Sequence, residues 1–241
     1  MQLDELRKFI KETILLEAAQ TIASAASAGV GLFQQPFELM SGSDATSHIL
    51  YDTVQMIEQL TSVRKLSKKI FLGVIEIKEN HGHGQCNGAV EVMAVAAEKG
   101  YGPLLYDIAM AEHGILMPDR EQLSAHAAKV WAYYKERDDV ISTPFHDIND
   151  ASNAPDSDAC CLVYDPQNPN YKDDSRNMSY EANFLISTTQ ISKNHSQALN
   201  KVVDHFAKQG LRVQIENIEK MLGKRAREYF VEVYQKKVLG K

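Results

Sequence analysis

The spacing of apolar residues changes along the chain, and each change predicts a different element. In the first segment, residues 3–17, four apolar side chains recur on one helical stripe, with charged residues opposite them. These four are Leu3, Leu6, Ile10 and Ile14. Such spacing predicts an amphipathic helix that needs a partner surface. Residues 18–47 are rich in Ala, Ser, Gly and Gln and have no sustained period, which favours a linker or an irregular segment.

The pattern becomes clearer after residue 69. Ile70–Ile77 and Gly88–Ala96 are two apolar runs rich in β-branched residues, and the turn-prone segment Glu79–Asn87 separates them. This arrangement predicts a hairpin with a long loop. In residues 49–60, by contrast, the pattern fits both a strand and a short helix.

The second run leads into a glycine-containing turn and then into alternating elements. The spacing predicts a helix over 103–112, a break at Gly114, a short strand over 115–117 and a second helix over 122–137. Strand, glycine turn, helix, strand and helix in this order indicate an α/β (α+β) protein.

The last third of the chain is mostly polar before it becomes helical. Residues 144–177 predict loop around the small apolar run Cys160–Tyr164, and residues 182–191 predict a strand. Three helices are then expected over 196–209, 213–222 and 225–238, with stops at Gly210 and Gly223. The expected organisation is a helix and linker over 1–47, a main domain over 48–192 and a helical extension over 193–241.

Charge and composition narrow the class of partners. The net charge is -6, which argues against general binding to nucleic acid or to an anionic membrane surface. No apolar run reaches the ~20 residues that span a bilayer, so we expect no membrane partner and a cytoplasmic protein. The odd number of cysteines, three, favours reduced thiols. His81, His83 and Cys86 carry metal-binding groups, but without a second pair at zinc spacing a solvated loop is the prediction, and no metal is expected.

The candidate chemistry lies in the glycine turn. A turn that leaves a strand and opens a helix presents backbone N–H groups at the positive end of the helix dipole, which suits a pyrophosphate. Gly100 and Gly102 occupy the points of closest backbone approach.

The context of this turn resembles the GNAT superfamily of acetyl-CoA-dependent N-acetyltransferases, whose signature is a strand, Arg/Gln-x-x-Gly-x-Gly/Ala and a helix, followed by a strand and a helix. The matching segments are the strand 89–96, the loop 97–102, the helix from Pro103, and the elements 115–120 and 124–131. The resemblance covers about 70 residues. It implies a mixed central sheet flanked by helices, with N- and C-terminal helical appendages.

The resemblance also implies roles for particular residues. Backbone groups of Met93, Ala94 and Val95 would bind the pantetheine and thioester of acetyl-CoA, the co-substrate. The pyrophosphate would lie in the loop formed by Glu98, Lys99, Gly100, Tyr101 and Gly102. Transfer to an amine needs a base, for which Asp119 and Glu91 are the candidates, and an acid, for which Tyr134 is the candidate.

Two positions depart from the family pattern, and they leave two functions open. Ala97 stands where the family usually has Arg or Gln. Trp131 stands where the family usually has the Tyr that serves as the catalytic acid. The first function is an active N-acetyltransferase with an unassigned amine acceptor. The second is an inactive GNAT-fold structural or interaction protein that binds a protein partner through its terminal helices.

Three further segments resemble bacteriophage proteins. The segment 101–107 and Pro118-Asp119-Arg120 are similar to phage-encoded GNAT-like proteins. Residues 6–18 are similar to short leading peptides of tailed-phage proteins, some of which are clipped after Leu-x-Glu, as in Leu15-Leu16-Glu17. The second function therefore includes a virion component as an alternative to a cytoplasmic protein.

Overall fold

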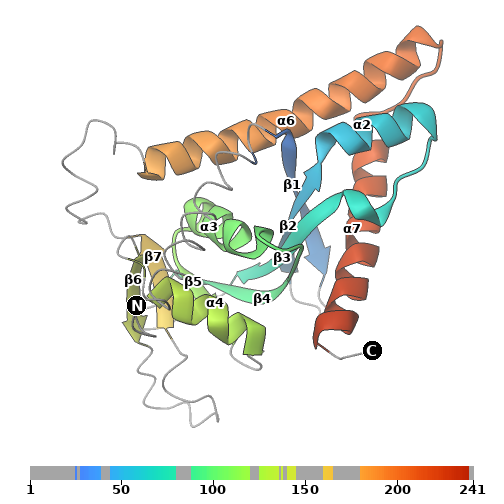
Figure 1. Cartoon of the computed structure of the whole chain (residues 1–241). Helices are drawn as coiled ribbons and strands as arrows, with labels where there is room; N and C mark the ends of the chain where they lie inside the picture. Colours follow the sequence, from blue (N-terminus) through green and yellow to red (C-terminus); the bar gives the residue numbers. More distant parts are fainter. Residues whose placement is uncertain are drawn as a thin grey trace, which may run out of the picture.

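The protein is built around one mixed β-sheet, seen in a computed structural model (Figure 1). The model describes residues 25, 28–38, 44–79, 88–119, 125–135, 137, 140–144, 160–164 and 180–238. The strands are β1 (Val30–Glu38), β2 (Asp44–Asp52), β3 (Phe71–Glu79), β4 (Val90–Ala97), β5 (Leu116–Pro118), β6 (Val140–Pro144) and β7 (Cys160–Tyr164). The helical elements are α2 (Thr53–Ser62), the 3-10 turn η1 (Lys68–Ile70), α3 (Tyr101–His113), α4 (Ala125–Lys135), α6 (Tyr180–Lys208) and α7 (Ile215–Val238).

The sheet combines an antiparallel half with one parallel pair. Its described strands lie in the order β1-β2-β3-β4-β5-β7-β6. The first four pair antiparallel in sequence order, β4 and β5 pair parallel, and β7 lies antiparallel between β5 and β6. The parallel pair follows from the crossover through α3, because parallel neighbours require a connection that returns to the same end of the sheet. The predicted mixed α/β arrangement is confirmed.

The predicted hairpin and glycine-bounded helix are also confirmed. β3 and β4 form an antiparallel pair, and the strand-to-helix turn before α3 is where the sequence placed it. Gly114 ends α3 with φ 80°, a left-handed conformation that favours glycine. Residues 49–60, whose pattern fitted both a strand and a short helix, contain the end of strand β2 followed by helix α2. The predicted helix over 3–17 lies outside the described residues.

The prediction of an irregular segment over 18–47 was wrong for β1 and the start of β2. β1 forms an edge of the sheet, and its middle contains Gln34, Gln35 and Pro36. An edge strand tolerates proline and polar residues because one side of it has no neighbour to pair with. These residues hid the alternation that would have predicted a strand.

Two predictions for the C-terminal region were wrong. Residues 182–191 are not a strand but part of α6, whose apolar stripe continues through Ile191 to Phe206. Packing along this stripe overrides the β-propensity of the segment. Gly223 does not end a helix, because α7 continues through it. Gly223 lies against the end of the Gln35 side chain, since a Cβ built on it would lie 1.8 Å from Gln35 Oε1.

Apolar clusters cover both faces of the sheet. On one face, α3 and α4 bury Leu105, Ile108 and Trp131 against sheet residues such as Ile75 and Val90. On the other face, α2, α6 and α7 complete a second cluster. Its members include Ile49, Tyr51, Val74, Leu199, Val202, Leu222 and Ala226. The C-terminal helices, orange and red in Figure 1, therefore supply about half of the buried residues of this second cluster. Among the described helices, none has both the length and the apolar character needed to cross a bilayer.

A buried polar chain fastens these helices to the sheet. Tyr51 Oη on β2 lies 2.7 Å from His195 Nδ1 on α6, and His195 Nε2 lies 3.1 Å from Glu219 Oε1 on α7. Burial lowers the pKa of His195 in spite of the nearby carboxylate, so the imidazole is neutral. A carboxylate accepts only, so Nε2–H donates to Glu219, and Nδ1 accepts the tyrosine hydroxyl.

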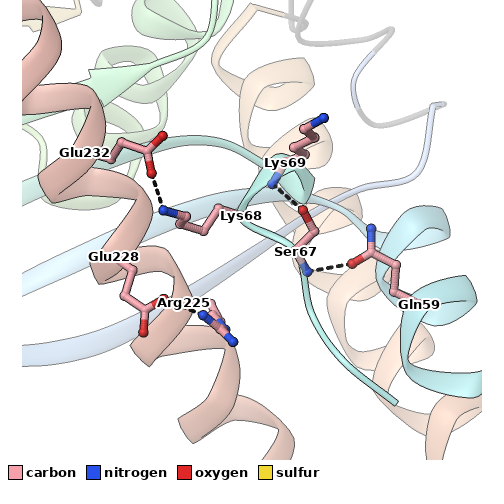
Figure 2. A network of polar contacts seen from close by, with 7 residues as sticks. All are labelled: Gln59, Ser67, Lys68, Lys69, Arg225, Glu228 and Glu232. Atoms are coloured by element: carbon pink, nitrogen blue, oxygen red, sulfur yellow. Dashed lines mark hydrogen bonds and ion pairs between the residues drawn. The ribbon is translucent and has the colours of Figure 1, made fainter. Parts of the chain in front are cut away.

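Polar contacts at the surface lie within α7 and join η1 to both α7 and α2. Lys68 pairs with Glu232, and Arg225 Nη1 lies 2.5 Å from Glu228 Oε2 (Figure 2). The Ser67 amide donates to Gln59 Oε1 over 2.7 Å. Exposed pairs of this kind contribute about 0 to 1 kcal/mol each, so the apolar cluster and the buried chain matter more for holding α7 in place.

We predict that Tyr51→Phe lowers the free energy of unfolding by about 1 to 3 kcal/mol, because it leaves His195 Nδ1 buried without its donor. Chemical denaturation measures the effect. Tyr234→Phe, a half-buried tyrosine near the end of α7, is the matched control and should change stability by less than about 0.5 kcal/mol. Equal stability of Tyr51→Phe and the wild type would contradict the role of this hydrogen bond.

Candidate functional site

The turn between β4 and α3 is held by backbone hydrogen bonds. The Glu98 amide donates to the Leu72 carbonyl over 2.9 Å, and the Tyr101 amide donates to the Glu98 carbonyl over 3.1 Å. Gly100 adopts φ 92°, a conformation that side chains with a Cβ rarely adopt. The chain therefore turns directly from the strand into the helix, and a glycine is required at the corner.

The helix end beyond this turn is open. Cβ atoms built on Gly100 and Gly102 would meet no described heavy atom within 4 Å. No side chain caps α3, and Pro103 in its first turn has no N–H. Among the described residues the Gly102 amide has no recorded hydrogen-bond acceptor, and it lies at the positive end of the helix dipole. An anion fits this end of α3.

The described pairing of β4 with β5 ends before the same turn. Within the described part of the sheet, β5 pairs with β4 only at Val90, Glu91 and Val92. The β3–β4 register passes from Val92 to Ala94, so Met93 is the extra residue of a β-bulge. A bulge bends its strand and increases the local twist. Beyond it, the edge of β4 that faced β5 has backbone groups without a described strand partner, and Met93, Ala94 and Val95 are only half-buried.

Three carboxyl groups lie around the end of this pairing, two of them predicted from sequence. Glu91 is buried on β4, and Asp119 directly follows the last residue of β5, Pro118, which is the partner of Val92. The third, Glu76 on β3, was missed, although it lies opposite Ala94. A single acidic residue inside the apolar run 70–77 was the signal for it. The structure thus brings both predicted bases and Glu76 to the strands that flank the bulge.

The Glu76 carboxyl group has a raised pKa. Its side chain is 7% exposed, and burial raises its pKa from 4.5 to about 7, although the positive charge of Arg227 on α7 opposes this shift. A carboxyl group with a pKa near 7 can both accept and release a proton at neutral pH. This is the property that a general base requires.

The C-terminal helix α7 also contacts the glycine turn. Tyr229 Oη donates to Glu98 Oε1 over 3.3 Å, and burial, followed by the charge of Glu98, raises the pKa of the tyrosine. Glu98 itself is exposed. One of the predicted loop residues is therefore positioned by an element about 130 positions later, which the sequence pattern did not indicate.

Tyr134, the residue predicted to act as the acid, lies on α4 and is buried against the start of α3. Its hydroxyl donates to the Pro103 carbonyl over 2.8 Å. Arg137 lies over its ring at 4.9 Å and forms a 2.6 Å ion pair with Asp107 of α3. Trp131 is buried edge-on against Tyr106. These contacts fasten α4 to the first half of α3, close to the glycine turn.

Comparison with protein-family models, with curated proteins and with solved structures finds no match for this chain. The site is therefore interpreted from its own residues and geometry.

We predict that Glu76→Gln stabilises the protein at pH 8 by up to about 3 kcal/mol and leaves its stability almost unchanged at pH 4.5. Below pH 4.5 the carboxyl is protonated in both folded and unfolded chains. As the pH rises to about 7, only the unfolded chain ionises freely, so the wild type loses stability across this range.

Urea denaturation at the two pH values measures this difference. Glu216→Gln, which removes an exposed carboxylate at the start of α7, is the control. No gain in stability for Glu76→Gln at pH 8 would show that the folded protein accommodates the ionised carboxylate without a penalty.

Proposed function

We propose that the protein is a GNAT-like N-acetyltransferase that binds acetyl-CoA along β4, beyond its last described pair with β5, and at the Gly100–Gly102 turn. The observation that supports this most strongly is the coincidence of two features at one place. The open, uncapped start of α3 directly follows the stretch of β4 that has no described β5 partner after the bulge at Met93.

These features match the two ends of the acetyl-CoA tail. The Gly102 amide in the first turn of α3 is suited to the pyrophosphate, and Lys99 adds an exposed positive charge. The free edge of β4 at Met93 to Val95 offers backbone donors and acceptors to the amide groups of pantetheine, as an added strand would. Acetyl-CoA would supply the thioester, and the protein would supply its orientation.

Three carboxyl groups are then available for the proton of the amine. In the transfer, the amine nitrogen bonds to the carbonyl carbon, the carbon–sulfur bond breaks, and a base accepts the amine proton. Asp119 and Glu91 are the bases implied by the family resemblance. Glu76 is a third candidate, because its raised pKa of about 7 lets it accept and release a proton at neutral pH. Its burial beneath α7 implies that the proton reaches it through a water molecule.

The positions of Tyr134 and Trp131 favour the alternative function, a GNAT-fold module without catalysis. The Tyr134 hydroxyl is engaged by the Pro103 carbonyl, and Trp131 is packed in the core. In this alternative the protein serves as a structural or interaction protein, with the exposed faces of α6 and α7 available to a partner. A virion component belongs to this alternative. Binding and turnover of acetyl-CoA separate the two functions.

We expect micromolar binding of acetyl-CoA by the wild type in isothermal titration calorimetry, abolished in Gly102→Glu. A glutamate there fills the open space before the helix and places a negative charge where the pyrophosphate would lie. Ala207→Glu, at an exposed site near the end of α6, adds the same charge elsewhere and should leave the affinity unchanged. A folded wild type that does not bind acetyl-CoA would reject the proposal and support the interaction module.

In a turnover assay with a panel of amines, Glu76→Gln should reduce kcat/KM by about 100-fold or more and abolish the loss of activity below pH 7. Release of the free thiol of CoA reports the rate. Because this variant is expected to be as stable as the wild type or more so, unfolding would not explain the loss. Parallel assays of Asp119→Asn and Glu91→Gln identify the base, and a larger loss in either would assign the role to that residue.

A further inference from the structure

A second polar cluster lies at the other end of α3. It consists of His48 on β2 and of Glu112 and His113 in the last turn of α3. The helix has 13 residues, so roughly 18 Å of helix separates this cluster from the glycine turn. The cluster is therefore separate from the proposed acetyl-CoA site and does not depend on it.

The three side chains converge closely. His48 Nε2 lies 3.0 Å from His113 Nε2, and His48 Nδ1 lies 2.9 Å from Glu112 Oε2. One ligand atom from each residue lies within 4.8 Å of the others. Gln34 on β1 donates to Glu112 Oε2 and so orients the carboxylate toward the histidines. Neighbouring strands and a helix end thus hold all three groups in place.

His48 is the most unusual member of the cluster. Its side chain is fully buried, and its Nδ1 makes no hydrogen bond with the described residues. The 2.9 Å contact with Glu112 brings the atoms close, but its direction does not satisfy the geometry of a hydrogen bond. Nδ1 thus faces the Glu112 carboxylate, whereas Nε2, on the other side of the ring, faces His113 and is the nitrogen in position to bind an ion.

A metal ion explains this arrangement. Metal–nitrogen bonds of about 2.1 Å that meet at about 90° to 110° place two imidazole nitrogens roughly 3.0 to 3.4 Å apart, which includes the observed separation. Two imidazoles and one carboxylate form a ligand set of zinc and of similar transition metals. The negative end of the α3 dipole, at His113, also favours a cation.

We propose that His48, Glu112 and His113 bind a divalent transition-metal ion of the zinc class. Glu112 is exposed and His113 is half-buried, so the coordination sphere opens to solvent on that side, where water completes it. The ion links β2 to the end of α3. No local pattern indicated this site, because His48 lies 65 positions before His113 and the ligands form no motif of fixed spacing.

The test is a titration of the full-length, untagged protein with Co²⁺ after treatment with a chelator, followed by visible absorption and by competition with Zn²⁺. The wild type should bind one Co²⁺ ion, and the visible absorption of the bound ion should change when these ligands are substituted. His113→Ala should weaken metal binding by more than about 100-fold. Removing a residue that only hydrogen-bonds to a metal ligand already lowers metal affinity by about 10- to 100-fold, and loss of the ligand itself should cost more. Glu112→Gln should weaken metal binding as well.

His205→Ala removes a histidine from α6 and is the matched control, with binding expected to match the wild type. Circular dichroism confirms folding of each variant, and Zn²⁺ should raise the unfolding temperature of the wild type and of His205→Ala but not of His113→Ala. If His113→Ala does not fold, the variant at the exposed Glu112 decides. No binding by the folded wild type, or binding that survives both ligand substitutions, overturns the proposal.

Discussion

The close contact between α3 and the sheet is the constraint on which both sites depend. A Cβ built on Gly73 of β3 would lie 2.7 Å from Leu105 Cδ1, so the helix approaches the strand at a point where only glycine leaves enough room. The Arg137–Asp107 ion pair and the Tyr134–Pro103 hydrogen bond hold the same helix from its other side. The start of α3 brings the glycine turn beside the free edge of β4, and its end brings Glu112 and His113 to His48.

The other face of the sheet shows how this protein handles buried charge. Glu76 lies among apolar neighbours, and only the field of Arg227 on α7 opposes the effect of its burial. Burial of an acid in this way lowers stability at neutral pH, and proteins usually retain such groups where protonation has a use. The same helix reaches Glu98 through Tyr229. α7 therefore influences both the carboxyl group and the turn that the proposed reaction requires.

Local patterns predicted the centre of the fold well and its edges poorly. The hairpin of β3 and β4, the glycine turn and the break at Gly114 depend on residues close together in sequence, so their signals survive without tertiary information. β1 was hidden by Gln34 and Pro36, which an edge strand tolerates, and Gly223 lies within α7 against a side chain of β1. Glu76 and His48 acquire their roles from neighbours on other elements, and no local pattern encodes these.

Tyr51 on β2 is connected through His195 and Glu219 to α6 and α7, which are synthesised much later than the strand. The first strands leave the ribosome long before Leu222, Ala226 and Tyr229, which cover their second face. Until then, Ile49 and Val74 have no apolar cover from α7, and such surfaces favour aggregation of a nascent chain. The sheet can therefore complete its packing only after α7 has been synthesised, and the growing polypeptide would gain most from a chaperone during that interval.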